Sequence, residues 1–248
     1  MNIYLGRTRY RSILQGAGCV MLLIHLAACA TTDSESVDPL EKYNRSMFAV
    51  NRFGDEVIYK PFGKAYKAII PSFARKGVHN FFDNLTTPRS AANNFLQGKP
   101  ARGVNELLRF MFNSTLGVAG LFDIAAAGGM DRYEEDFSQT LAVWGMPEGP
   151  YMVIPIWGPR SMLATAALPV DFFSDLQRSI EDTGTRNRLY VLRLIDTRSR
   201  LLTTEEMLNK SQDPYIAFRE AYLQNRQFNI HDGEIPDDEE IYFFDDQE

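Results

Sequence analysis

The stretch Val104-Asn-Glu-Leu-Leu-Arg-Phe-Met-Phe112 decides the fold class of this chain. Its apolar side chains recur at spacings of three and four residues, which is the pattern of a helix with one buried face. Comparable spacing appears in three further sets, namely Tyr43, Met47, Val50, Gly54 and Val57; Val78, Phe81, Phe82 and Leu85; and Val191, Leu194, Ile195 and Leu202. Strand-like alternation is scarce, so the sequence predicts an all-α body without internal repeats.

Acidic residues followed by proline mark two of the expected helix starts. Asp38-Pro39-Leu40-Glu41 offers a capping side chain and then proline at the first helical position. Asp213-Pro214-Tyr215 repeats this arrangement near the C-terminal end. A short helix from Pro88 to Gln97 is expected to end at Gly98, since glycine commonly terminates helices.

The composition excludes several classes of protein. The chain has 248 residues, is 45% hydrophobic and carries a net charge of −6, which argues against a disordered chain and gives no indication of nucleic-acid binding. Two cysteines are too few for a disulfide framework or a cysteine-based zinc site. The chain is therefore expected to form a globular body with its own core.

The first 28 residues have the pattern of an export signal. Arg7, Arg9 and Arg11 precede an apolar stretch that runs from Ile13 to Ala28 and is too short for a comfortable transmembrane span. Its end, Leu26-Ala-Ala-Cys29, resembles the bacterial lipobox, in which cleavage leaves the cysteine as an acylated first residue. We therefore expect a signal peptide at residues 1–28, a lipid anchor at Cys29 and a polar tether through residue 37. The alternative is an ordinary signal peptide followed by an incidental cysteine.

Residues 232–248 form a strongly acidic tail. This segment holds nine acidic residues and no lysine or arginine, which is typical of a disordered, solvated tail. The apolar run Ile241-Tyr-Phe-Phe244 within it leaves a recognition role open.

Two stretches do not fit an ordinary helical bundle. Thr115 to Gly129 is small and apolar apart from Asp123, and reads either as a helical hairpin lying in one leaflet or as a buried core helix. Trp144 to Pro159 has four prolines and three glycines, so it cannot form a continuous helix, yet it is rich in aromatic and aliphatic residues. The side chains expected to face the membrane are Leu116, Val118, Leu121, Phe122, Trp144, Tyr151 and Trp157.

No catalytic or cofactor motif is found in the sequence, which lacks His-Glu-x-x-His, Gly-x-Ser-x-Gly and glycine-rich phosphate loops. His79 is expected to be a structural hydrogen-bonding residue rather than part of a triad. Glu134-Glu135-Asp136 is expected to be a solvated helix cap rather than an acid–base or metal site.

Arg186, Arg193 and Arg200 are seven residues apart, so they share a helical face, either beside acidic partners or in contact with headgroup phosphates.

Several short segments recur in a recognisable order between Asp38 and Arg226. They are Asp38-Pro-Leu-Glu-Lys-Tyr-Asn-Arg-Ser-Met-Phe48, Asn84-Leu85-x-x-Pro88, Asn94-Phe-Leu-Gln-Gly98, Arg109-Phe-Met-Phe-Asn113, Gly117-x-x-Gly120-x-x-Asp123, Glu135-Asp-Phe-x-Gln-Thr-Leu141, Gly149-Pro-Tyr151 and Asp213-Pro-Tyr215 with Arg219-Glu-Ala-Tyr222. This series resembles the MlaA/VacJ outer-membrane lipoproteins, which maintain the lipid asymmetry of the Gram-negative outer membrane. After Gly158-Pro159 that family commonly shows an Arg-Asp pair, whereas this chain reads Arg160-Ser.

The resemblance implies a helical domain over residues 38–231, built as a ring of amphipathic helices in the inner leaflet of the outer membrane around a polar channel. Such proteins pass mislocalised phospholipid from the outer leaflet to a soluble periplasmic carrier, associate with trimeric porins, catalyse no reaction, and need no cofactor or metal. Gly145 and Gly149 match the family's hairpin loop, which is thought to gate the channel.

Two other functions stay open at this point. One is a membrane-anchored lipid or cell-wall hydrolase, and the other is a scaffold that docks onto a porin without moving lipid. The burial of Thr115–Gly129 and of Tyr151–Trp157 bears on the choice, since exposed apolar side chains favour insertion into lipid and buried ones favour a soluble body.

Overall fold

The computed structural model describes residues 38–234. The predicted signal peptide, the Cys29 anchor, the tether and all but the first three residues of the acidic tail lie outside the described residues. The chain divides into two compact units, residues 1–39 and 40–248, and the account below concerns the second. Within residues 38–234, none of the helices has the length and hydropathy that a bilayer span requires.

Helices make up most of the described unit, which confirms the predicted helical fold class. They are α2 (Glu41–Gly54), a π-helical segment (Asp55–Tyr59), α3 (Lys60–Ile69), α4 (Ser72–Leu96), α5 (Pro100–Thr115), α6 (Ile124–Ala127), α7 (Phe137–Val143), α8 (Met162–Ser174), a short 3₁₀ turn (Leu176–Ser179), α9 (Thr183–Leu208) and α10 (Pro214–Ile230). Two short strands, β1 (Tyr151–Ile154) and β2 (Gly158–Ser161), form a hairpin that the sequence pattern did not predict.

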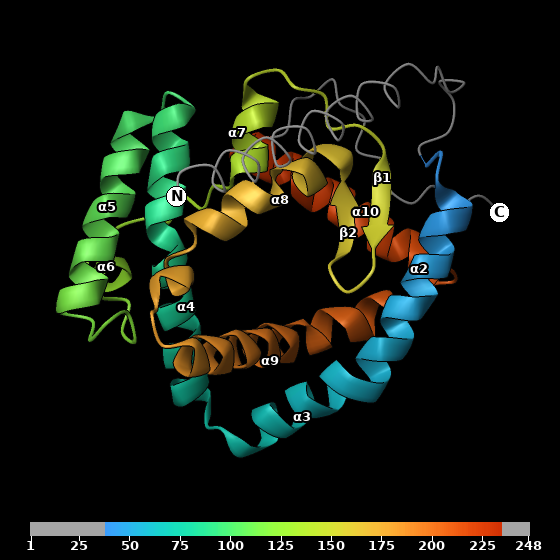
Figure 1. Ribbon diagram of the computed structural model, residues 1–248, viewed down its shortest axis with the longest axis horizontal. Coiled ribbons are helices and arrows are strands. Elements are labelled where there is room, and N and C mark those ends of the chain that lie inside the picture. The colour runs from blue at the N-terminus through green and yellow to red at the C-terminus, as the bar shows by residue number, and fades with distance from the viewer. Residues whose placement is uncertain (1–37, 235–248) are drawn as a thin grey trace, which may run out of the picture. The chain divides into compact units, whose positions relative to one another are not determined.

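The elements of this unit follow a circuit rather than stacking in layers (Figure 1). The helix α4 packs against both α5 and α9, and α3 runs along α9. On the other side, α7 packs on α8, α10 touches α7 and β2, and α2 lies against β1, which closes the circuit.

The helix starts and stops agree only in part with those expected. Asp213 caps α10 by accepting a hydrogen bond from Tyr215 N at 2.9 Å, as predicted. By contrast, α2 begins at Glu41, two residues later than expected, and has no side-chain cap. The predicted helix start at Pro88 is wrong, because Pro88 lies inside the 25-residue helix α4. A proline removes one hydrogen bond from a helix, and α4 contains it without ending.

The hairpin occupies most of the Trp144–Pro159 stretch. Its antiparallel register runs from Tyr151 opposite Ser161 to Ile154 opposite Gly158. Tyr151 and Val153 point into an apolar cluster with Tyr215, against which side chains of α2 and α10 pack. Ile156 and Trp157, at the turn, are 75% and 62% exposed. The stretch is therefore buried on one face of the strands and exposed at its tip.

Candidate functional site

The distribution of polar and apolar side chains is the reverse of that in most soluble proteins. Among the described residues, buried polar and charged side chains outnumber buried apolar ones, and Asn44, Asn94 and Thr140 are completely enclosed. Large apolar side chains are instead exposed along most of the helices, with Phe53 and Phe73 at 72% and 78%. Extensive exposed apolar surface is typical of sites that contact a membrane or a partner.

Six of the seven side chains predicted to face the membrane are exposed. They are Leu116, Val118, Leu121, Phe122, Trp144 and Trp157, and their contact with lipid stays a prediction. The prediction for Tyr151 is wrong, because this side chain is only 4% exposed. Its ring points from β1 into the core, where it packs at 6.5 Å from the ring of Tyr215 and at 5.8 Å from that of Tyr222.

The Thr115–Gly129 stretch is neither a helical hairpin nor a core helix. The helix α5 ends at Thr115, and the chain then turns through Val118 and Ala119, which have left-handed backbone angles (φ 53° and 56°). The single-turn helix α6 follows, with Ala125 buried. The result is a tight loop that presents its apolar side chains outward and fixes its ends on buried polar groups.

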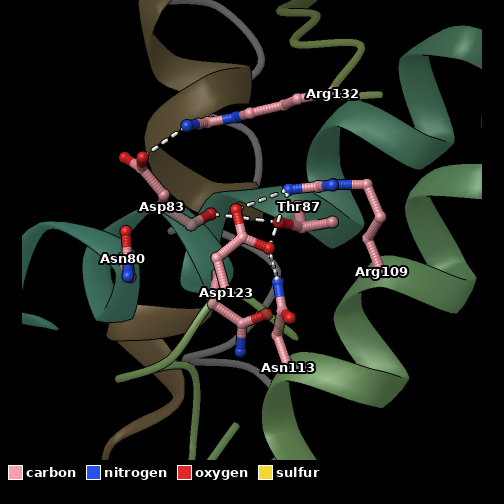
Figure 2. A pocket seen from close by; sticks show the side chains of 8 residues that line it. Asn80, Asp83, Thr87, Arg109, Asn113, Asp123 and Arg132 are labelled. Carbon is pink, nitrogen blue, oxygen red and sulfur yellow. Dashed lines mark hydrogen bonds and ion pairs between the residues drawn. The ribbon is translucent and has the colours of Figure 1, made fainter. Parts of the chain in front are cut away.

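A polar cluster between α4, α5 and α6 holds this loop in place (Figure 2). Nη2 of Arg109 donates to both carboxylate oxygens of Asp123, at 3.1 and 2.9 Å. Asn113 donates to Asp123 at 2.9 Å and accepts from Ala125 N at 3.0 Å, and Asp123 also caps α6 by accepting from Ala126 N. Arg109 and Asn113, the two ends of one recurring sequence segment, thus both bind Asp123, the last residue of the next segment.

The same cluster lines a small polar pocket, into which the labelled side chains of Figure 2 point. Burial alone would raise the pKa of Asp123, but hydrogen bonds from Ala126 and Asn113 and the charge of Arg109 hold it below its ordinary value. Arg132 reaches across the pocket to Asp83. Because nearly every donor and acceptor here is committed to another protein group, the cluster is suited to fixing the loop rather than to chemistry.

Two asparagines of α2 attach the hairpin through its backbone. Asn44 Nδ2 donates to Tyr151 O at 3.1 Å while its Oδ1 accepts from Val153 N at 2.8 Å. Asn51 makes the same pair of bonds with Ile154 O (2.9 Å) and Ile156 N (2.8 Å). Sequence reasoning did not single out these residues. Their seven-residue spacing on one helical face was the available signal, and it gains meaning only once a strand lies beside the helix.

The loop that leads into the hairpin contains both predicted gating glycines. Gly145 and Gly149 have φ of +87° and +68°, a conformation that other residues rarely adopt. The loop is fixed at one end by Trp144 Nε1, which donates to Leu96 O at 3.0 Å. Near its other end, Glu148 accepts two hydrogen bonds from Arg226, at 2.8 and 3.1 Å. Between these two attachments the loop has open space around Gly145, where a Cβ would meet nothing within 4 Å.

The three arginines of α9 each have a protein partner. Arg186 donates to Ile180 O at 3.0 Å, Arg193 donates to Asp175 at 2.6 Å, and Arg200 lies 3.4 Å from the carboxylate of Asp196. They share a helical face as the spacing indicated, and acidic partners lie beside two of them. A role in contacting headgroups stays a prediction.

His79 and the 134–136 acids have structural partners. His79 Nε2 lies 3.1 Å from Asp83, and burial lowers the pKa of this imidazole. Asp136 caps α7 by accepting from Gln139 N at 2.8 Å. Glu135 is buried, not solvated as expected, and accepts from Gln97 at 2.8 Å. Residues 38–234 hold no group of three or more metal-ligating side chains of the His, Cys, Asp or Glu type.

Known proteins share this sequence and fold. Residues 36–229 match the MlaA lipoprotein family. The intermembrane phospholipid transport system lipoproteins MlaA of Shigella flexneri and Escherichia coli K12 are each 34% identical, with 86% of this chain and 86% of theirs covered. The Haemophilus influenzae protein of that name is 31% identical, with 88% and 90% covered.

A solved structure described as the structural basis for maintenance of bacterial outer membrane lipid asymmetry superimposes with a TM-score of 0.69. It is 35% identical to this chain, and the match covers 78% of this chain and 98% of that one. Sequence and fold agree along most of the length of both proteins, so the chain belongs to the MlaA lipoprotein family.

Proposed function

We propose that this protein is an outer-membrane lipoprotein that removes mislocalised phospholipid from the outer leaflet and thereby maintains lipid asymmetry. Acyl chains on Cys29 would anchor it, and the helical unit would sit in the inner leaflet on the periplasmic side. Relatives over most of the chain are named for intermembrane phospholipid transport. The proposal includes a polar passage for the headgroup and transfer of the lipid to a soluble periplasmic carrier.

The reversed distribution of side chains carries this proposal. Exposed Phe, Trp, Leu and Val side chains are stable against acyl chains, whereas in water they favour aggregation. A charged headgroup pays several kcal/mol to enter hydrocarbon. A polar passage through the unit would lower that cost for a headgroup whose acyl chains stay in the apolar phase.

The loop with Gly145 and Gly149 is the proposed gate. Its two fixed ends and its free φ angles allow it to change conformation without unfolding a helix. Contact with a trimeric porin is proposed for part of the exposed apolar surface, by analogy with the family.

Two measurements test the proposal. The first is lipid movement by the full, acylated protein reconstituted in vesicles that carry a fluorescent phospholipid in one leaflet. We expect faster movement than in protein-free vesicles, and a scaffold would leave the rate unchanged. The second is the outer-leaflet phospholipid of a strain that lacks the gene. Normal asymmetry in that strain would overturn the proposed function.

A further inference from the structure

The guanidinium of Arg160, on β2, has no close partner in the part of the chain that the structure describes. Its Nε is buried, and among residues 38–234 no group accepts a hydrogen bond from it. Burial lowers the pKa of its guanidinium, because no ion pair compensates the loss of water. Buried polar nitrogens are normally hydrogen-bonded, so the unsatisfied Nε of this half-buried arginine beside the hairpin needs an explanation.

The carboxylates that face Arg160 are already engaged. Asp136 caps α7, accepts from Ser138 Oγ at 2.6 Å and lies 3.8 Å from Arg226. Asp171, on α8, accepts from Phe137 N at 2.9 Å. Neither forms an ion pair with Arg160, although both act on it electrostatically.

A second arginine, Arg89, lies near the carboxylate of Asp171. Nε of Arg89, on α4, is also buried without a hydrogen-bond acceptor, and it lies 3.9 Å from Asp171, the outer limit of an ion pair. Both guanidiniums lower the pKa of Asp171, which burial nevertheless raises. Two arginines with buried, unsatisfied Nε atoms thus act on the same carboxylate, that of Asp171, and neither donates a hydrogen bond to it.

We propose that Arg89 and Arg160 form a binding site for a phosphate group, either that of a phospholipid headgroup or free phosphate. Guanidinium groups present several N–H donors in a planar arrangement that matches phosphate oxygens. The site lies beside the hairpin and the base of its loop. As a headgroup site it rests on the proposed function, since it would contact the lipid at the proposed gate.

The experiment titrates the full, acylated protein in a phosphate-free sugar detergent. Inorganic phosphate is the probe in one arm and dihexanoyl phosphatidylglycerol in the other, with calorimetry and the shift in unfolding temperature as readouts. We expect Arg160→Gln to weaken binding about tenfold, the loss of one or two charge-assisted hydrogen bonds. Arg160→Lys should lose less, and Arg89→Gln should also weaken binding. Arg188→Gln, which replaces an exposed arginine of α9, is the matched control.

Stability separates this role from a structural one. Because Arg160 has no close partner, Arg160→Gln should unfold at the wild-type temperature or higher without phosphate, and should lose the shift that phosphate causes. Binding of the lipid probe alone identifies a headgroup site, and binding of inorganic phosphate identifies free phosphate as a ligand. Equal affinities for wild type and Arg160→Gln, or no binding of either probe by the wild type, overturn the inference. If the wild type moves lipid in vesicles while these results fail, the proposed function stands without this site.

Discussion

Arg109 donates from a single nitrogen to both carboxylate oxygens of Asp123, at 3.1 and 2.9 Å, and its side chain is only 5% exposed. This pair joins α5 to the start of α6 and so closes the apolar loop between them (Figure 2). Removing the partner of so deeply buried an arginine destabilises the fold far more than removing the partner of a surface arginine.

Asp123→Asn is therefore expected to lower the free energy of unfolding by about 2–3 kcal/mol. Chemical denaturation of the detergent-solubilised protein measures this loss. Glu134→Gln is the control, because Glu134 is 58% exposed in its pair with Arg132 and should cost less than about 0.5 kcal/mol. Equal losses in the two variants would contradict a special role for the buried pair.

Because the pKa of Asp123 is lowered in the folded state, we expect the stability of the protein to depend on pH. The pKa of Asp123 lies below its ordinary value of 3.8 because, although burial opposes it, the hydrogen bonds and Arg109 favour the charged form. The folded state binds the proton less tightly than the unfolded state, so this stabilisation is complete above the ordinary pKa and is lost as the pH falls through the lowered one. Between about pH 5 and about pH 2, wild type should lose more stability than Asp123→Asn. Parallel pH profiles would refute this linkage.

Gly120 and Gly129 allow a matched comparison of two alanine substitutions. Both have left-handed φ, +90° and +80°, but a Cβ at Gly120 would lie 2.5 Å from Cβ of Asn84, whereas one at Gly129 would meet nothing within 4 Å. Gly129→Ala should cost about 1 kcal/mol from backbone strain alone. Gly120→Ala should cost roughly 2–4 kcal/mol, since it adds a clash with a buried side chain. Similar unfolding temperatures for both variants would count against the close approach of the loop to α4.

The two asparagines that hold the hairpin differ in burial, and their loss should differ accordingly. Asn44 is fully enclosed and Asn51 is half-buried. Asn44→Ala should cost about 3 kcal/mol, because it leaves two buried backbone groups without partners, and Asn51→Ala about 1 kcal/mol. Hydrogen exchange of the Val153 and Ile156 amides reports each attachment separately. Unchanged protection of Val153 in Asn44→Ala would show that the strand is held by other contacts.

The proposed gate is tested by Gly145→Ala. Alanine at a φ of +87° strains this conformation by about 1 kcal/mol without steric contact, which corresponds to about a fivefold change in the population of loop conformations. We expect the rate of lipid movement in vesicles to change by a similar factor. Gly129→Ala, with comparable strain outside the loop, should keep the wild-type rate. If both variants move lipid at the same rate as wild type, the loop does not limit transport.

The sequence predicted correctly those helices that are specified by neighbouring residues, through a capping side chain or a regular apolar spacing. Asp213 caps α10 where the Asp-Pro pair indicated, and the apolar spacing of Val104–Phe112 lies within α5. Pro88 misled the prediction, because proline is a good first residue of a helix and its position inside α4 depends on the packing of that helix against α5 and α9.

Contacts between distant segments could not be read from the sequence. The hairpin has only four residues in each strand, too few for a clear alternation, and Asn44 is separated from Tyr151 by 107 positions. The burial of Tyr151 follows from that attachment, since an aromatic residue in a Pro- and Gly-rich loop fits a membrane interface and a core equally well. Arg89 and Arg160 come to act on the same carboxylate, that of Asp171, only through the fold.

The spacing of the two asparagines on α2 matches the spacing of the backbone groups that they bind on the hairpin. Seven residues of α-helix advance about 10.5 Å, and the three residues from Tyr151 to Ile154 advance about 10 Å in a strand. Helix and strand therefore come back into phase at Asn44 and Asn51. One inserted residue between the two would rotate the second amide by about 100° away from the strand, so the length of this helical segment is constrained even where its side chains touch nothing.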